Sequence, residues 1–175
     1  MGGFAHFFRI DMEKHKQKIL PDRYQVIPRT LIFIRNKDEI LLLKGAKDKK
    51  IWSGLYNGIG GHIERGEDVL SAAYRELFEE TGLQNIQLNL RAIIFIDVEE
   101  YQGISMFVFL GNSKQKVLVS SEEGNSDWIK IDRIQNFPLV EDLNQLIPMV
   151  LSTEKKIQFG RYYYNNGKLV MEFNK

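Results

Sequence analysis

The chain has 175 residues, of which 43% are hydrophobic, and it carries 24 basic and 23 acidic side chains. This length suits one domain with a substantial hydrophobic core. The formal net charge of +1 excludes a strong overall field for a nucleic-acid polymer or an anionic membrane, so we expect any anionic partner to be bound locally. The absence of cysteine excludes disulfides, thiolate metal sites and cysteine nucleophiles, and it is typical of a reducing compartment.

The N-terminal segment 1–22 has only short apolar patches, and it lacks the charged start and long apolar run of a secretion signal. No later segment approaches the roughly 20 apolar residues of a membrane-spanning helix. We therefore expect a soluble, cytoplasmic protein in which residues 1–22 are an N-terminal extension.

Two β-rich runs, 26–35 and 39–44, are separated by a short polar turn and predict a β-hairpin. The next segment, 45–61, is rich in lysine and glycine and carries two aromatic side chains, Trp52 and Tyr56. Such a composition indicates a loop that is either flexible or closely packed on a neighbour.

A helix is expected from Glu67-Asp68 to Thr81-Gly82, because Gly82 suits the left-handed position after a helix C-terminus. The further expected elements are strands at 91–98, 104–110 and 128–131, a polar loop at 120–127 and a helix at 143–151. Strands interspersed with helices predict an α/β sandwich with a mixed β-sheet, formed by one domain over residues 23–153.

Residues 154–175 contain two β-prone runs that meet at Asn166-Gly167. This dipeptide is a strong signal for a two-residue hairpin turn. We expect a C-terminal β-hairpin appendage, which either covers the core or pairs with a second copy in a homodimer.

Three carboxylates crowd one edge of the helix expected before Gly82. Glu79 and Glu80 follow Glu76 by three and four residues. On a helix the three side chains therefore fall within about 100° of one another, beside the apolar stripe. Like charges at this spacing repel one another, and a hard divalent cation would relieve the repulsion. Mg²⁺ prefers oxygen ligands and usually binds one or two carboxylates together with substrate phosphate oxygens. The pattern therefore predicts a magnesium site, the alternative being a solvated charged face.

Two more charged residues suit the same site. Arg75 lies four residues before Glu79 and can hold that carboxylate through a bidentate contact. Glu67, just before the helix, can reach over the site as an orienting group. A metal ion at this rim would polarise a phosphoryl oxygen, lower the pKa of a bound water and orient an in-line attack.

The spacing of these residues forms one long pattern: Gly61, five residues, Glu67, seven residues, Arg75-Glu76-Leu77, one residue, Glu79-Glu80, one residue, Gly82-Leu83. Average residue frequencies give such a match by accident about 10⁻¹⁰ of the time per window. The pattern resembles the signature of the Nudix hydrolase family at every fixed position, and the chain around it is similar to the MutT-like enzymes. The resemblance extends over about residues 25–151.

The resemblance implies a Nudix α/β/α sandwich and hydrolysis, by water, of nucleoside diphosphates linked to another moiety. It implies Mg²⁺ or Mn²⁺ as the cofactor and a small nucleotide as the substrate. The implied metal ligands are Glu76, Glu79, Glu80 and the Gly60 carbonyl. Arg75 matches an orienting arginine, Glu67 an accessory position and Gly61 the first glycine of the signature.

The general base remains open. In this family it is either a glutamate of the signature or a glutamate on a later loop. Glu122 and Glu123 are the loop candidates here, and both also suit plain exposed loop charges.

Substrate choice depends on residues outside the signature. The run at 52–61, WSGLYNGIGG, is similar to that of MutT-like enzymes that hydrolyse oxidised purine triphosphates such as 8-oxo-dGTP, which implies that Asn57 faces the base. An amide can pair with a purine edge through a donor and an acceptor. Trp52 and Tyr56 either stack on the base or anchor the loop on the core.

Glu141 and Asp142 fall where one branch of those enzymes places acidic residues against the base. The same two residues suit the N-terminal cap of the helix expected at 143–151. Lysines at 44, 47, 49 and 50 either gather triphosphate oxygens or are solvated.

Two other functions compete with oxidised purine triphosphate hydrolysis. Tyr101 lies 18 residues beyond Leu83, a spacing often found in dinucleoside polyphosphate hydrolases, so that substrate or a nucleotide sugar remains an alternative. The other is a module that senses a nucleotide without hydrolysing it. Such modules commonly lose glutamates of the signature, whereas this chain keeps them all.

Overall fold

The computed structural model describes residues 20, 22–46, 52–116, 118, 124–154 and 156–174. In chain order the elements are β1 (Gln25–Asn36), β2 (Glu39–Gly45), β3 (Tyr56–Asn57), α1 (Val69–Thr81), β4 (Leu88–Glu99), β5 (Gln102–Asn112), β6 (Gly124–Lys130), the 3₁₀ helix η2 (Ile131–Asn136), α2 (Leu143–Leu151), β7 (Gln158–Asn165) and β8 (Lys168–Phe173). Among the described residues no helix has the length and apolar character needed to cross a membrane.

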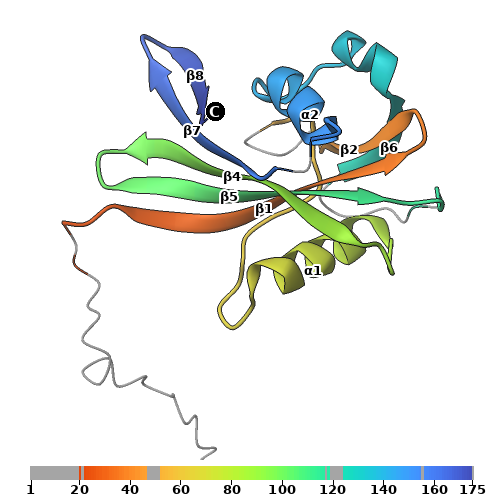
Figure 1. Ribbon diagram of the computed structural model, residues 1–175, viewed down its shortest axis with the longest axis horizontal. Coiled ribbons are helices and arrows are strands. Elements are labelled where there is room, and N and C mark those ends of the chain that lie inside the picture. The colour runs from red at the N-terminus through yellow and green to blue at the C-terminus, as the bar shows by residue number, and fades with distance from the viewer. Residues whose placement is uncertain are drawn as a thin grey trace, which may run out of the picture.

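The eight strands found in the described ranges form one mixed sheet in the order β3-β2-β1-β5-β4-β7-β8, with β6 also paired to β2. The β1–β5 and β4–β7 pairs are parallel, and the other pairs are antiparallel. The helices α1 and α2 cover opposite faces of this sheet (Figure 1). The α/β class and the mixed sheet predicted from the sequence are confirmed.

Each face of the sheet has its own apolar core. On one face Ala73 and Leu77 of α1 pack with Ile32 and Ile34 of β1. On the other face the buried side of α2 packs with Leu31 and Phe33 of the same strand, and this core extends to Tyr162 of β7. Successive residues of β1 therefore serve opposite layers, as a strand buried on both faces requires.

The helix α1 begins and ends where local signals place it. Asp68 caps the N-terminus by accepting hydrogen bonds from the backbone N–H groups of Leu70 and Ser71 at 2.8 and 3.0 Å. Gly82 follows the C-terminus with φ of 72°, and its N–H donates to the Phe78 carbonyl. The signature carboxylates are thereby held on a helix whose two ends are fixed.

The glycine-rich segment before α1 lies along the free edge of β1. Backbone hydrogen bonds join Thr30 to Gly61 at 2.9 Å and Ile32 to Ile59 at 2.6 and 3.0 Å. Gly60 has φ of 144°, and a Cβ on it would collide with the carbonyl oxygen of Thr30. A glycine is required here because any side chain would push the segment off the strand. We call residues 58–63 the glycine segment below.

Of two C-terminal regions, one differs from the sequence-based expectation and the other agrees with it. Residues 124–127, predicted as part of a polar loop, belong to β6, because their backbone pairs with β2 from Leu42 to Gly45. The tail forms the expected hairpin, with Asn166 and Gly167 at φ of 50° and 74°. This hairpin continues the main sheet, since β7 pairs with β4, and it rises on the same side as α2 (Figure 1).

Replacing Gly82 with alanine should lower stability by about 1 kcal/mol, because alanine is strained in the left-handed conformation. For a chain of this size the melting temperature should fall by about 2 to 4 °C. Gly82→Asn is the matched variant, since asparagine tolerates this conformation better. Thermal unfolding of the two variants tests the cap, and an equal loss in both would contradict it.

Candidate active site

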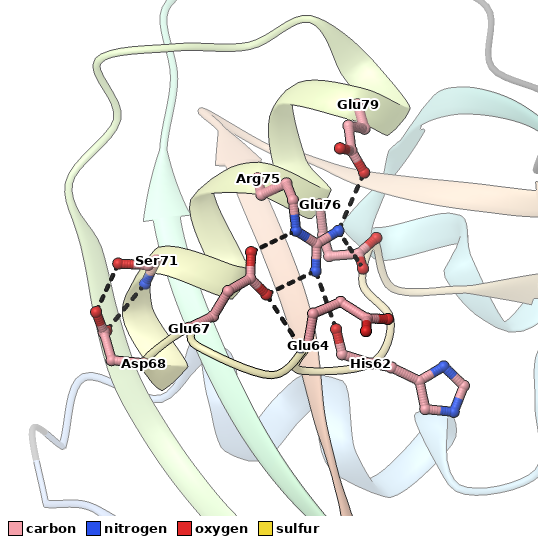
Figure 2. Close-up of polar contacts among 8 residues, drawn as sticks. All are labelled: His62, Glu64, Glu67, Asp68, Ser71, Arg75, Glu76 and Glu79. Carbon is pink, nitrogen blue, oxygen red and sulfur yellow. Dashed lines mark hydrogen bonds and ion pairs between the residues drawn. The ribbon is translucent and has the colours of Figure 1, made fainter. Parts of the chain in front are cut away.

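Arg75 lies at the centre of a polar network formed by α1 and the loop before it (Figure 2). Its Nε and Nη2 donate to the two carboxylate oxygens of Glu67 at 2.7 and 3.0 Å. Its Nη1 donates to Glu76 at 2.8 Å and to Glu79 at 3.1 Å, and Nη2 also donates to the His62 carbonyl at 3.0 Å. One guanidinium therefore joins three carboxylates and the backbone of the glycine segment.

The bidentate partner of Arg75 is Glu67 and not Glu79, which corrects the expectation from the sequence. Glu79, one helical turn away, meets Arg75 through a single hydrogen bond, whereas both Glu67 oxygens face the guanidinium. The hydrogen bond with Glu67 is the largest cause that raises the pKa of Arg75, and the same bond lowers the pKa of Glu67. Both groups are therefore ionised at neutral pH.

Glu76 and Glu80 face the glycine segment. The Gly60 N–H donates to Glu80 Oε2 at 3.4 Å, and Glu80 is only 4% exposed. A Cβ on Gly61 would lie 2.5 Å from Glu76 Oε1, so this carboxylate packs against the bare Cα of the glycine. The Glu79 side chain, by contrast, is 56% exposed. Two of the three helix glutamates and both predicted glycines thus meet in one place.

The oxygen atoms gathered here fit a hard divalent cation. Carboxylate and carbonyl oxygens are the ligands that Mg²⁺ and Mn²⁺ prefer. No three acidic or histidine side chains of the described ranges converge as a ready-made cage. Mg²⁺ does not require one, because it usually takes one or two carboxylates and completes its shell with water and phosphate oxygens. Glu76 and Glu80, with Gly60 beside them, meet that requirement.

A cavity of about 210 Å³ lies on the α2 side of the sheet, next to the glycine segment. Its apolar lining is Leu31, Ile96, Ile104, Met106, Val140 and Leu169. Its polar lining is Arg29, Thr30, Asn57, Glu141, Asp142, Tyr162 and Tyr164, and Trp52 also lines it. Gly60 and Gly61 line it as well. The glycine segment therefore touches the α1 carboxylates and the cavity at once.

Asn57, Glu141 and Asp142, the residues predicted to contact a base, all line the cavity. The Asn57 Oδ1 accepts a hydrogen bond from the Gly58 N–H at 2.8 Å, which leaves the amide's amino group to donate to a ligand. The Asp142 side chain makes no capping hydrogen bond to α2. Burial raises the pKa of Asp142 to about 6, and the charge of Glu141 adds to the rise.

The remaining predicted residues differ in exposure and contacts. Glu141 lies at the exposed rim of the cavity, and its Oε2 accepts a hydrogen bond from the Tyr164 hydroxyl at 3.1 Å. Tyr56 is 6% exposed; its hydroxyl donates to Asp127 at 2.9 Å and its ring packs edge-on against Phe137. Tyr56 therefore anchors the loop on the core, whereas Trp52 lines the cavity. Glu122, Glu123 and the lysines at 47, 49 and 50 lie outside the described residues.

Sequence reasoning misses four polar residues of the cavity: Arg29, Thr30, Tyr162 and Tyr164. Arg29 lies on β1, and its Nη2 is hydrogen-bonded to His62 Nε2 at 2.9 Å. A signal for it exists, because one charge interrupts the apolar alternation of Ile27, Leu31 and Phe33. Tyr162 has no such signal, since its position depends on the parallel pairing of β7 with β4, which is distant in sequence.

A comparison with protein families matches the NUDIX domain to residues 26–150. The chain belongs to the Nudix family. As a Nudix hydrolase it acts on nucleoside phosphates, and enzymes of this family generally use divalent metal ions. The family predicted from the signature is thereby confirmed.

Individual relatives of this Nudix hydrolase agree with that assignment. The oxidized purine nucleoside triphosphate hydrolase of Mus musculus is 27% identical over 146 residues, which cover 83% of this chain and 91% of that enzyme. A solved MutT protein from Bacillus halodurans has a TM-score of 0.72 at 22% identity and covers 85% of this chain and 98% of its own. A bifunctional NMN adenylyltransferase/ADP ribose pyrophosphatase from Francisella tularensis, solved with AMP and a manganese ion, has a TM-score of 0.57 at 23% identity over 74% of this chain and 42% of its own. The two structures confirm the fold.

The two neighbouring glycines should respond differently to alanine. In Gly60→Ala the new Cβ collides with backbone and the φ of 144° is strained, so the melting temperature should fall sharply. In Gly61→Ala the Cβ meets only the movable end of Glu76, so folding should survive while the carboxylate is displaced. Thermal unfolding and Mn²⁺ titration of both variants test this. Intact Mn²⁺ binding by a folded Gly61→Ala protein would contradict the assignment of Glu76.

Asp142→Asn should stabilise the protein above pH 6. A carboxyl group whose pKa rises from 3.8 to about 6 on folding contributes stability below pH 4, and this contribution is lost as the pH rises through 6. About 2 pH units at 1.36 kcal/mol each set an upper limit of about 3 kcal/mol. Urea unfolding from pH 4 to pH 8 should show the variant gaining on the wild type with pH. The exposed Asp132→Asn is the control, and an equal gain there would contradict the account.

Proposed function

We propose that this Nudix hydrolase converts nucleoside triphosphates with an oxidised purine base, such as 8-oxo-dGTP, to the nucleoside monophosphate and pyrophosphate with Mg²⁺ or Mn²⁺. The observation that carries the proposal is the double contact of the glycine segment. Gly60 and Gly61 touch the α1 carboxylates and also line a cavity with hydrogen-bonding groups. A ligand across this segment would have its phosphates at α1 and its base in the cavity.

The size and lining of the cavity support a base-sized occupant. Pockets for whole drug-sized ligands measure about 300 to 1,000 Å³, so about 210 Å³ suits one ring system with the phosphates outside. The amino group of Asn57 donates to a base acceptor, and the two Asp142 oxygens accept from base N–H groups. The similarity to the mouse oxidized purine nucleoside triphosphate hydrolase points to the same substrate class.

The reaction is the attack of water on a phosphorus atom of the triphosphate. The water oxygen forms a bond to phosphorus, the bond from phosphorus to the bridging oxygen breaks, and the proton passes to a carboxylate. Glu76, Glu79, Glu80 and the Gly60 carbonyl would hold the metal ion, which supplies charge neutralisation at phosphate oxygens and a lowered pKa of bound water. The proton acceptor is a glutamate of α1 or Glu123.

Arg75 and Glu67 support this chemistry without contacting the substrate. The guanidinium holds Glu76 and Glu79 at fixed positions, and the bidentate contact with Glu67 fixes the guanidinium in turn. Carboxylates oriented before the substrate arrives do not have to be ordered during the reaction. Arg75 is therefore a positioning residue.

Glu76→Gln and Glu80→Gln should each reduce kcat/KM at least about 100-fold, because even residues that only orient metal ligands account for 10- to 100-fold effects. Glu64→Gln is the matched control, because Glu64 is an exposed residue of the same loop that does not line the cavity. Only its backbone N–H reaches the network, by donating to Glu67 at 3.1 Å, and the substitution keeps that group. Hydrolysis of 8-oxo-dGTP, dGTP, a dinucleoside polyphosphate and ADP-ribose with Mg²⁺ measures both activity and preference. Binding without hydrolysis, or the highest kcat/KM on a dinucleoside polyphosphate, would overturn the proposal.

A further inference from the structure

The hydroxyl of Tyr162 is buried without a hydrogen-bond partner among the described residues. Tyr162 is 2% exposed, its ring packs edge-on against Phe173 at 5.9 Å, and its side chain lines the cavity. Its Oη makes no hydrogen bond to any other residue that the structure describes. Burying an unpaired hydroxyl costs free energy, and phenylalanine would fill the same space without that cost. The stability of the fold therefore gives no reason for a hydroxyl at this position.

The unpaired hydroxyl is not isolated. The structure leaves four buried side-chain polar atoms without a partner among the residues it describes, and three belong to residues that line the cavity: Arg29 Nε, Thr30 Oγ1 and Tyr162 Oη. Buried polar groups are normally paired, so their concentration at one cavity indicates a polar ligand. The fourth, Ser126 Oγ, belongs to β6 outside the cavity.

Tyr162 lines the cavity together with Asp142. Burial, and then the negative charge of Asp142, raise the pKa of Tyr162, so the hydroxyl keeps its proton at neutral pH. No hydrogen bond joins the two side chains, although both line the same space. The hydroxyl is left to donate and the carboxylate to accept.

We propose that Tyr162 is a specificity-determining residue whose hydroxyl donates a hydrogen bond to a carbonyl oxygen of the purine base, while Asp142 accepts from the N–H group next to that carbonyl. The ligand class is a purine with a lactam edge, meaning a ring C=O beside a ring N–H. This inference rests on the proposed function, because it places the base in the same cavity. Tyr162 also lies beyond residues 26–150, which match the Nudix domain.

Two edges of an oxidised guanine have this chemistry. One is the 6-carbonyl with N1–H, which ordinary guanine shares. The other is the 8-carbonyl with N7–H, which only the oxidised base carries. Adenine has neither edge, because it presents an amino group and ring nitrogens. Tyr162 therefore provides a reason for rejecting unoxidised adenine nucleotides whichever edge is read.

The test is equilibrium binding of four deoxynucleoside monophosphates, measured by calorimetry with Mg²⁺ on the full chain. The ligands are dAMP with no lactam edge, dGMP with the 6-edge, 8-oxo-dAMP with the 8-edge and 8-oxo-dGMP with both. The wild type should bind most tightly the ligands that carry the lactam edge contacted by Tyr162. Tyr162→Phe should bind those ligands about 5- to 10-fold more weakly, while its affinity for dAMP should be unchanged. Selective loss with dGMP assigns the 6-edge, and selective loss with 8-oxo-dAMP assigns the 8-edge.

Tyr163→Phe is the matched control, since Tyr163 is the next residue on β7 and its hydroxyl donates to Glu172 at 2.8 Å, away from the cavity. It should leave all four affinities unchanged. The melting temperature of Tyr162→Phe should stay at or above the wild-type value, because no protein partner is lost. Equal weakening of all four ligands, no change in any, or no discrimination by the wild type would overturn the inference.

Binding of monophosphates needs no hydrolysis, so the proposed function is judged separately. If the wild type discriminates among the monophosphates and Tyr162→Phe does not, yet no triphosphate is hydrolysed, then the proposed function fails and the inference stands. If triphosphates are hydrolysed and Tyr162→Phe leaves the preference unchanged, then the inference alone fails.

Discussion

The backbone pairing of the glycine segment with β1 is the constraint on which the rest of the site depends. Thr30 and Ile32 bond to Gly61 and Ile59, and this pairing fixes the segment at the edge of the sheet. Gly60 permits it because a side chain would collide with β1. From this one segment the chain continues into α1 with its carboxylates, and the same segment lines the cavity on the other layer. Moving it would separate the two halves of the site.

One side chain, Arg75, orients the charges of α1 by contacting several groups at once. Helix geometry alone would leave Glu76, Glu79 and Glu80 repelling one another. Arg75 offsets part of that repulsion by contacting two of them, and its own position is fixed by Glu67 and by the His62 carbonyl in the glycine segment. The carboxylates are thus oriented relative to the segment that also lines the cavity. This short stretch of backbone therefore connects the proposed cation site with the cavity proposed for the base.

Local sequence signals were sufficient to predict the α1 part of the candidate site, but not the contacts that form the cavity. The ends of α1 follow from Asp68 and Gly82, and the spacing of the glutamates follows from helix periodicity, so sequence alone places them. The Glu67 contact to Arg75 could not be read this way, because it depends on how the preceding loop folds back. Asp142 and Tyr162 meet only because α2 and β7 pack on one face of the sheet. Contacts between distant elements leave no periodic trace in the sequence.

The account places the cation at α1 and the base in the cavity, on either side of the glycine segment. Its most direct test is a crystal structure with 8-oxo-dGMP and Mn²⁺, recorded at a wavelength where manganese scatters anomalously. The account predicts an anomalous peak bounded by Glu76, Glu80 and Gly60, a phosphate beside it, and the base in the cavity between Asp142 and Tyr162. A base bound outside that cavity, or a manganese ion away from α1 and the glycine segment, would contradict it.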